Sequence, residues 1–125
     1  MTLYNPTVLD HFQNPRNLRE LKNPSATGMG ASRVCGDVMT LYLEVKHDKI
    51  SSATFTTMGC GAAIASGSIM TGMLQGKTIE EAEAMGPNDI LDAMGGLPNI
   101  KLHCPDLAIE ALRAALKNLK STAKT

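Results

Sequence analysis

Aromatic side chains are scarce in this sequence, which has no Trp, two Tyr and two Phe among 125 residues. Its twelve Lys and Arg are balanced by twelve Asp and Glu, and no run of basic residues occurs. Proteins that bind nucleic acids usually combine a basic surface with aromatic rings on which bases stack. Because the sequence has neither feature, we expect no nucleic-acid partner.

Long apolar runs are also missing. The apolar stretches are interrupted by Gly and Ser, whereas a membrane-spanning helix needs about 20 consecutive apolar residues. The N-terminus lacks the basic start and apolar run of a secretory signal peptide. We therefore expect a cytoplasmic protein that does not associate with membranes.

Cysteine is the third scarce residue, with three in the chain. An odd number of widely spaced cysteines in a reducing compartment argues against a disulfide framework. Hydrophobic residues make up 43% of the sequence and charged residues 19%, which is a globular composition. We expect one domain over residues 1–125, with a core built largely from Ala and Met.

Two segments have the alternating pattern of half-buried strands. In Val38–Val45 and in Ile50–Thr57, apolar side chains recur at every second position. The short polar link His47-Asp48-Lys49 between them predicts an antiparallel hairpin. A further short strand is expected near Thr27–Ser32.

Helix signals fill most of the remaining sequence. Asn5-Pro6 has the pattern of an N-cap followed by Pro in the first turn, and Thr78 with Glu81 has that of a capping box. The expected helices are Pro6–Gln13, Gly61–Leu74, a short one from Thr78 to about Gly86, Asn88–Met94, and Cys104 to about Leu119. This order predicts an α+β fold in which a small antiparallel sheet of about three strands has helices packed on one face.

Three smaller predictions concern side chains within these elements. Gly67 and Gly72 are expected to allow close packing of the helix that contains them. His11 and His47 are expected to be solvated. The core is expected to include five methionines: Met58, Met70, Met73, Met85 and Met94.

Each cysteine lies where a predicted element meets a turn. Cys35 precedes the hairpin, Cys60 follows it, and Cys104 begins the last helix. The intervening 24 and 43 residues exclude zinc fingers and ribbons, whose paired cysteines lie about two to four residues apart. If the end of the sheet and the two helix starts converge, the three sulfur atoms form one site.

Two other ligand types flank these cysteines, the carboxylate of Asp37 and the imidazole of His103. Carboxylate is a harder ligand than thiolate, so such a set holds an iron–sulfur cluster less tightly than four cysteines would. Weak holding is a fault in an electron carrier but an advantage in a protein that gives its cluster away. Gly36, Gly59 and Gly61 are expected to leave room for a bulky inorganic group.

Together these motifs resemble the IscU-type iron–sulfur cluster scaffold proteins, the family that includes the N-terminal domain of NifU. The resemblance covers nearly the whole chain. It is carried by Leu9-Asp10-His11-Phe12-Gln13-Asn14-Pro15-Arg16-Asn17, Cys35-Gly36-Asp37, Gly59-Cys60-Gly61-Ala62-Ala63-Ile64-Ala65-Ser66, Gly76-Lys77-Thr78 and Lys101-Leu102-His103-Cys104.

The resemblance implies a scaffold and not an enzyme. A [2Fe-2S] cluster would be built from iron and from sulfur that a cysteine desulfurase delivers as a persulfide, and would then pass to acceptor apoproteins. The implied ligands are Cys35, Cys60 and Cys104, with Asp37 or His103 completing the set. Cys104 is also the implied persulfide acceptor, Lys101 the residue implied in ligand exchange, and Tyr4 the one linked to homodimers.

One departure from the family concerns partners. The family's chaperone-recognition segment Leu-Pro-Pro-Val-Lys is here Leu97-Pro98-Asn99-Ile100-Lys101, without the second Pro. This change argues against dependence on a specialised heat-shock chaperone. The chain also lacks the inserted segment between the second and third cysteines that marks the zinc-bound SufU relatives.

Two other classes of function fit the same residues. A zinc-binding sulfur-transfer protein could use this ligand set, because Zn²⁺ accepts sulfur, nitrogen and oxygen ligands. A thiol enzyme could use Cys104 as its nucleophile. Visible absorbance after anaerobic purification distinguishes a cluster from zinc, which is colourless.

Overall fold

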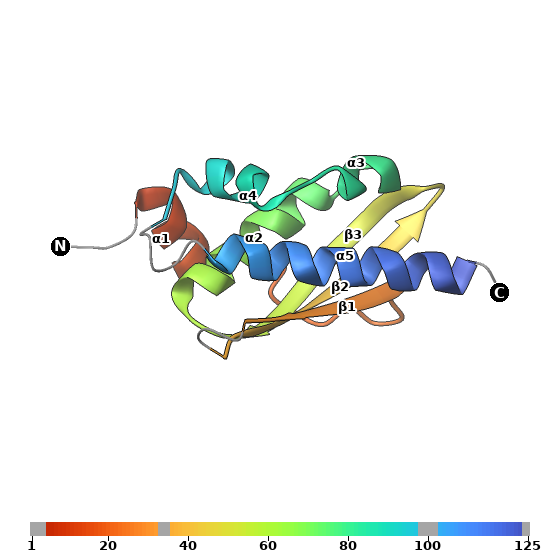
Figure 1. Cartoon of the computed structure of the whole chain (residues 1–125), viewed down its shortest axis with the longest axis horizontal. Coiled ribbons are helices and arrows are strands. Elements are labelled where there is room, and N and C mark those ends of the chain that lie inside the picture. Colours follow the sequence, from red (N-terminus) through yellow and green to blue (C-terminus); the bar gives the residue numbers. More distant parts are fainter. Residues whose placement is uncertain (1–4, 33–35, 98–102, 124–125) are drawn as a thin grey trace.

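The computed structural model in Figure 1 shows helices lying along one face of a small twisted sheet. The structure describes residues 5–32, 36–97 and 103–123, without the side chains of residues 103 and 121–123. The α+β fold with three antiparallel strands is confirmed, whereas the single domain over residues 1–125 stays a prediction. Among the described residues, no helix is both long and apolar enough to cross a bilayer.

The sheet contains three antiparallel strands in the order β1-β2-β3, at β1 Ala26–Ala31, β2 Val38–Lys46 and β3 Lys49–Met58. The expected hairpin and third strand are confirmed within one or two residues of their predicted ends. The hairpin turn is tighter than expected, because only His47 and Asp48 separate β2 from β3. Both have positive φ (54° and 62°), as in the two-residue turns that match strand twist.

Five helices follow the predicted order. The capping box of α3 is confirmed, since Thr78 and Glu81 exchange both of its hydrogen bonds. The last helix extends further than its predicted end near Leu119, because polar residues after the apolar stripe continue it. The bounds are α1 Pro6–Gln13, α2 Gly61–Leu74, α3 Ile79–Glu83, α4 Pro87–Met94 and α5 His103–Ala123.

The core lies between the sheet and helices α2 and α5. Phe55 of β3 is fully buried against Gly67 of α2, where an added Cβ would lie 2.4 Å from the ring. Gly28 of β1 packs on the backbone of α5, where a Cβ would lie 2.1 Å from the nitrogen of Ala115. The prediction for Gly67 is therefore confirmed, but the prediction for Gly72 is wrong, because no atom would lie within 4 Å of a Cβ there.

Candidate metal centre

Three of the predicted ligand residues meet where the sheet ends and two helices begin. Val38 at the start of β2 pairs with Met58 at the end of β3, so the residues before one strand and after the other are neighbours. Asp37 and Cys60 lie in these two positions, and Cys60 is the N-cap residue of α2. Cys104 reaches the same place from the first turn of α5.

The ligand atoms of Asp37, Cys60 and Cys104 all lie within 4.8 Å of one another. The two sulfur atoms are 3.8 Å apart, and the thiol of Cys60 donates to Oδ2 of Asp37 at 3.6 Å. Two thiolates at about 2.3 Å from one tetrahedral metal ion would lie about 3.8 Å apart. The sulfur positions therefore suit a shared metal without rearrangement of either helix.

Burial differs among the three candidate ligand residues. Asp37 is 6% exposed and Cys104 is 0% exposed, whereas Cys60 is half-buried. An ionised carboxylate is costly to bury without a partner, which a bound cation would provide. Solvent thus reaches Cys60 most easily of the three.

Gly59 makes the close approach of Asp37 to Cys60 possible. A Cβ at position 59 would lie 2.8 Å from Cγ of Asp37, too close for any other residue. The prediction that Gly59 leaves room for an inorganic group is wrong, because the carboxylate itself fills this space. Gly36 has a φ of +72°, so its role is conformational, and a Cβ on Gly61 would meet the ring of Phe12 at 3.1 Å.

The other predicted site residues cannot be placed relative to these three, because they lie in parts of the chain that the structure does not describe. Cys35 and Lys101 lie outside the described residues, as does the side chain of His103. The geometry therefore joins Asp37, Cys60 and Cys104, and the contributions of the others stay predictions.

Two exposed apolar residues lie near the turn that carries Cys60, and neither is among the predicted site residues. Met58 is 80% exposed, so its assignment to the core is wrong, and Phe12 is 43% exposed while packing over Gly61. Met58 pairs with Val38, and side chains alternate between the two faces of a sheet, so Met58 lies on the face opposite to the one on which Met39 and Phe55 are buried.

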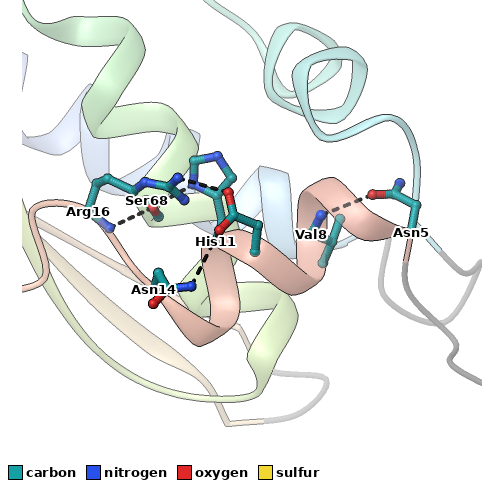
Figure 2. Close-up of polar contacts among 7 residues, drawn as sticks. Asn5, Val8, His11, Asn14, Arg16 and Ser68 are labelled. Carbon is teal, nitrogen blue, oxygen red and sulfur yellow. Dashed lines mark hydrogen bonds and ion pairs between the residues drawn. The ribbon is translucent and has the colours of Figure 1, made fainter.

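His11 is not solvated as predicted, whereas His47 is exposed as predicted. Nδ1 of His11 lies 2.7 Å from Oγ of Ser68 in α2, which also accepts the backbone N–H of Arg16 at 2.9 Å. Figure 2 shows these three residues together where α1 meets α2. Burial, and secondarily the charge of Arg16, lowers the pKa of His11. The neutral ring thus joins α1 to the helix that Cys60 begins.

Comparison with known proteins gives one consistent family. Residues 3–125 match the model of the NifU-like N terminal domain. The iron-sulfur cluster assembly scaffold protein IscU 1 of Archaeoglobus fulgidus is 46% identical over 114 residues, which cover 91% of this chain and 74% of that protein. The corresponding IscU of Escherichia coli (strain K12) is 41% identical over 122 residues, which cover 94% of each chain.

Solved structures agree on the fold. A putative scaffold protein for the SUF system from Fervidobacterium islandicum has a TM-score of 0.73 at 24% identity, covering 91% of this chain and 96% of that one. A NifU-like N-terminal structure from Brucella abortus has a TM-score of 0.71 at 20% identity, covering 98% and 96%. From the sequence match and the shared fold together, we conclude that this chain belongs to the NifU-like N-terminal domain family.

Proposed function

We propose that this protein is a scaffold on which an iron–sulfur cluster is assembled and from which it passes to acceptor apoproteins. The observation that supports this most is the convergence of Asp37, Cys60 and Cys104 within 4.8 Å. The names of its relatives support the same role, since they are cluster assembly scaffold proteins. A scaffold holds its cargo and does not turn over a substrate, so the role needs no catalytic residue.

The proposed cargo is a [2Fe-2S] cluster held by Cys35, Cys60 and Cys104, with Asp37 or His103 as the fourth ligand. The chain has only three cysteines, so one ligand must be another residue type. A carboxylate or an imidazole binds the iron of an iron–sulfur cluster less strongly than a thiolate does. We propose that this fourth ligand makes the cluster transferable.

The sulfur of the cluster is proposed to come from a cysteine desulfurase as a persulfide on Cys104, whose outer sulfur an external two-electron reductant would release as sulfide while the Cys104 thiolate is restored. This assignment rests on the family resemblance. Exposure alone would favour Cys60 as the acceptor, because Cys60 is the more exposed of the two described thiols. Mass spectrometry after reaction with a desulfurase and free cysteine should find an added sulfur on the peptide containing Cys104. An added sulfur on Cys60 alone would contradict the assignment.

Other features of the proposed role concern compartment and partners. We place the protein in the reducing cytoplasm, where thiols stay available for metal. We propose that the protein can form homodimers and that it does not depend on a specialised chaperone. Leu97 of the altered recognition segment packs against the core, and residues 98–101 lie outside the described residues.

Anaerobic reconstitution with iron and sulfide tests the proposed function. The parent should develop the visible absorbance of a cluster, and a triple variant with Cys35→Ser, Cys60→Ser and Cys104→Ser should not. Met58→Ala is the matched control, because it alters an exposed side chain two residues before Cys60 and leaves all three thiols in place. Equal cluster binding by the triple variant would overturn the proposal.

A zinc-binding sulfur-transfer protein is the second candidate. The sulfur separation of 3.8 Å suits tetrahedral Zn²⁺ as well as iron. Protein purified without oxygen should then contain one zinc per chain, remain colourless with iron and sulfide, and still accept sulfur. Zinc bound to protein that readily forms a cluster would favour the scaffold, with zinc occupying the cluster-free form.

A further inference from the structure

A hollow lies between α3 and the C-terminal half of α5, away from the candidate metal centre. Its volume is about 340 Å³, and we name it the α5 basic groove. Figure 1 shows α3 above the end of α5 that is opposite Cys104. The groove is lined by Glu83 from α3 and by Arg113, Leu116, Lys117 and Lys120 from α5.

The groove concentrates positive charge in a chain that has no net charge. Three of the twelve basic side chains line it, but only one of the twelve acidic side chains does. Lys120 pairs with that acid, since its Nζ lies 2.7 Å from Oε1 of Glu83. In the part of the chain that the structure describes, neither Arg113 nor Lys117 forms an ion pair.

Helix stability does not account for this charge. Cations near a helix C-terminus interact favourably with its dipole, but the effect is confined to about the last turn. Lys120 lies in the last turn of α5, whereas Arg113 and Lys117 lie further inside the helix. Their spacing of four residues and the three from Lys117 to Lys120 keep all three cations on one face. Leu116, 4% exposed, forms an apolar floor among them.

We propose that the α5 basic groove is a docking surface for an acidic segment of a partner protein. Carboxylates of such a segment would pair with Arg113 and Lys117, and an apolar side chain between them would cover Leu116. Nucleic acid fits less well, because no aromatic side chain lines the groove for base stacking. A membrane surface also fits less well, since the apolar stripe of α5 is already buried in the core.

The distance between the groove and the candidate metal centre determines whether two partner proteins can bind at the same time. Lys117 lies thirteen positions after Cys104 along α5, which corresponds to about 20 Å of helix. A partner bound at the groove would therefore leave the side of the candidate metal centre where Cys60 is partly exposed free to contact a second protein. Donor and acceptor could then occupy the scaffold together.

Fluorescence anisotropy with a labelled peptide of alternating Glu and Leu tests the proposal on the full chain. The parent should bind the peptide at low ionic strength and lose it as salt is added. The double variant Arg113→Glu with Lys117→Glu should bind about tenfold more weakly. The control with the same change in net charge is Arg19→Glu with Lys22→Glu, on exposed residues of the loop after α1, and should keep parental affinity.

Circular dichroism must show that both double variants are folded, and Arg113→Gln with Lys117→Gln replaces the first if it is not. Equal weakening in the groove and control variants would overturn the proposal, because net charge alone would then explain binding. Tighter binding of RNA or of anionic vesicles than of the acidic peptide, lost in the groove variant, would also overturn it. None of these results depends on whether a cluster is bound.

Discussion

The two helices that bring cysteines to the metal centre are held in the fold by different means. Helix α2 has ten buried residues out of 14 and no polar face, and its four less buried residues, Gly61, Ile64, Gly72 and Met73, are all uncharged. Helix α5 is amphipathic, with a buried stripe that includes Leu112 and Ala115 and an exposed basic face. One helix is therefore enclosed by the core, and the other covers it.

Both helices nevertheless depend on a glycine that lies far from the cysteine concerned. Gly67, seven residues after Cys60, lets α2 rest against the ring of Phe55. Gly28 lets β1 touch the backbone of α5 at Ala115, eleven residues after Cys104. We infer that the close packing of α2 at Gly67 and of α5 at Gly28 helps to set the distance between the sulfur atoms of Cys60 and Cys104.

The largest effect is expected from Gly28→Ala. The added methyl group would overlap backbone atoms of α5, which cannot move aside as a side chain can. We expect the free energy of unfolding to fall by about 3 kcal/mol, at the upper end of the range for overpacking. Urea denaturation measures this change. Met29→Ala in the same strand removes a side chain that is 60% exposed, and should change the free energy by less than about 0.5 kcal/mol.

If Gly28→Ala is no less stable than Met29→Ala, α5 can move away from β1 without cost. The comparison would then fail, because the position of Cys104 would not depend on the contact between β1 and α5.

A smaller effect is expected from Gly67→Ala in α2. The methyl group would overlap the Phe55 ring, and the gain in helix propensity of about 1 kcal/mol offsets part of the cost. We expect a net loss of about 1–2 kcal/mol in urea denaturation. Gly72→Ala is the matched control in the same helix. Since nothing lies near its Cβ, it should stabilise by up to about 1 kcal/mol, and a similar gain in Gly67→Ala would contradict the packing argument.

The smallest effect is a pH dependence that involves His11 and the contact of α1 with α2. Burial lowers the pKa of His11 in the folded protein, so the unfolded chain binds the proton more readily. The stabilisation is present above the ordinary pKa of about 6.5 and is lost as the pH falls through the folded value. Urea denaturation at several pH values should therefore show lower stability in acid. His11→Gln should reduce this dependence, and an unchanged dependence would contradict its assignment to His11.

Much of the fold could be predicted because its signals are local. Asn5 and Thr78 cap their helices as their positions in the sequence predict, and the alternation in β2 and β3 matches the buried face. The positions of Cys60 and Cys104 at the starts of their helices are also local signals, and all these features depend on neighbours in sequence. The convergence of the two cysteines is predicted only on the condition that the end of the sheet and the two helix starts meet.

The remaining features depend on residues distant in sequence. No residue next to Gly59 in sequence indicates that the carboxylate of Asp37, 22 residues earlier, packs against it. Gly67 and Gly72 have similar sequence surroundings, and only the position of Phe55 distinguishes them. The bond between His11 and Ser68 joins residues 57 positions apart. A sequence pattern states which side chains could be buried, but only the packing of elements decides what each one meets.

The central claim is that the centre at Asp37, Cys60 and Cys104 holds a cluster weakly enough to release it. The most direct measurement follows a reconstituted cluster, by visible circular dichroism, after anaerobic mixing with an apo-ferredoxin and an iron chelator. We predict that the parent transfers its cluster to the ferredoxin and that Asp37→Ala transfers it more slowly, because the weak ligand assists release. A cluster that remains on the parent, or that leaves Asp37→Ala faster, would contradict the claim.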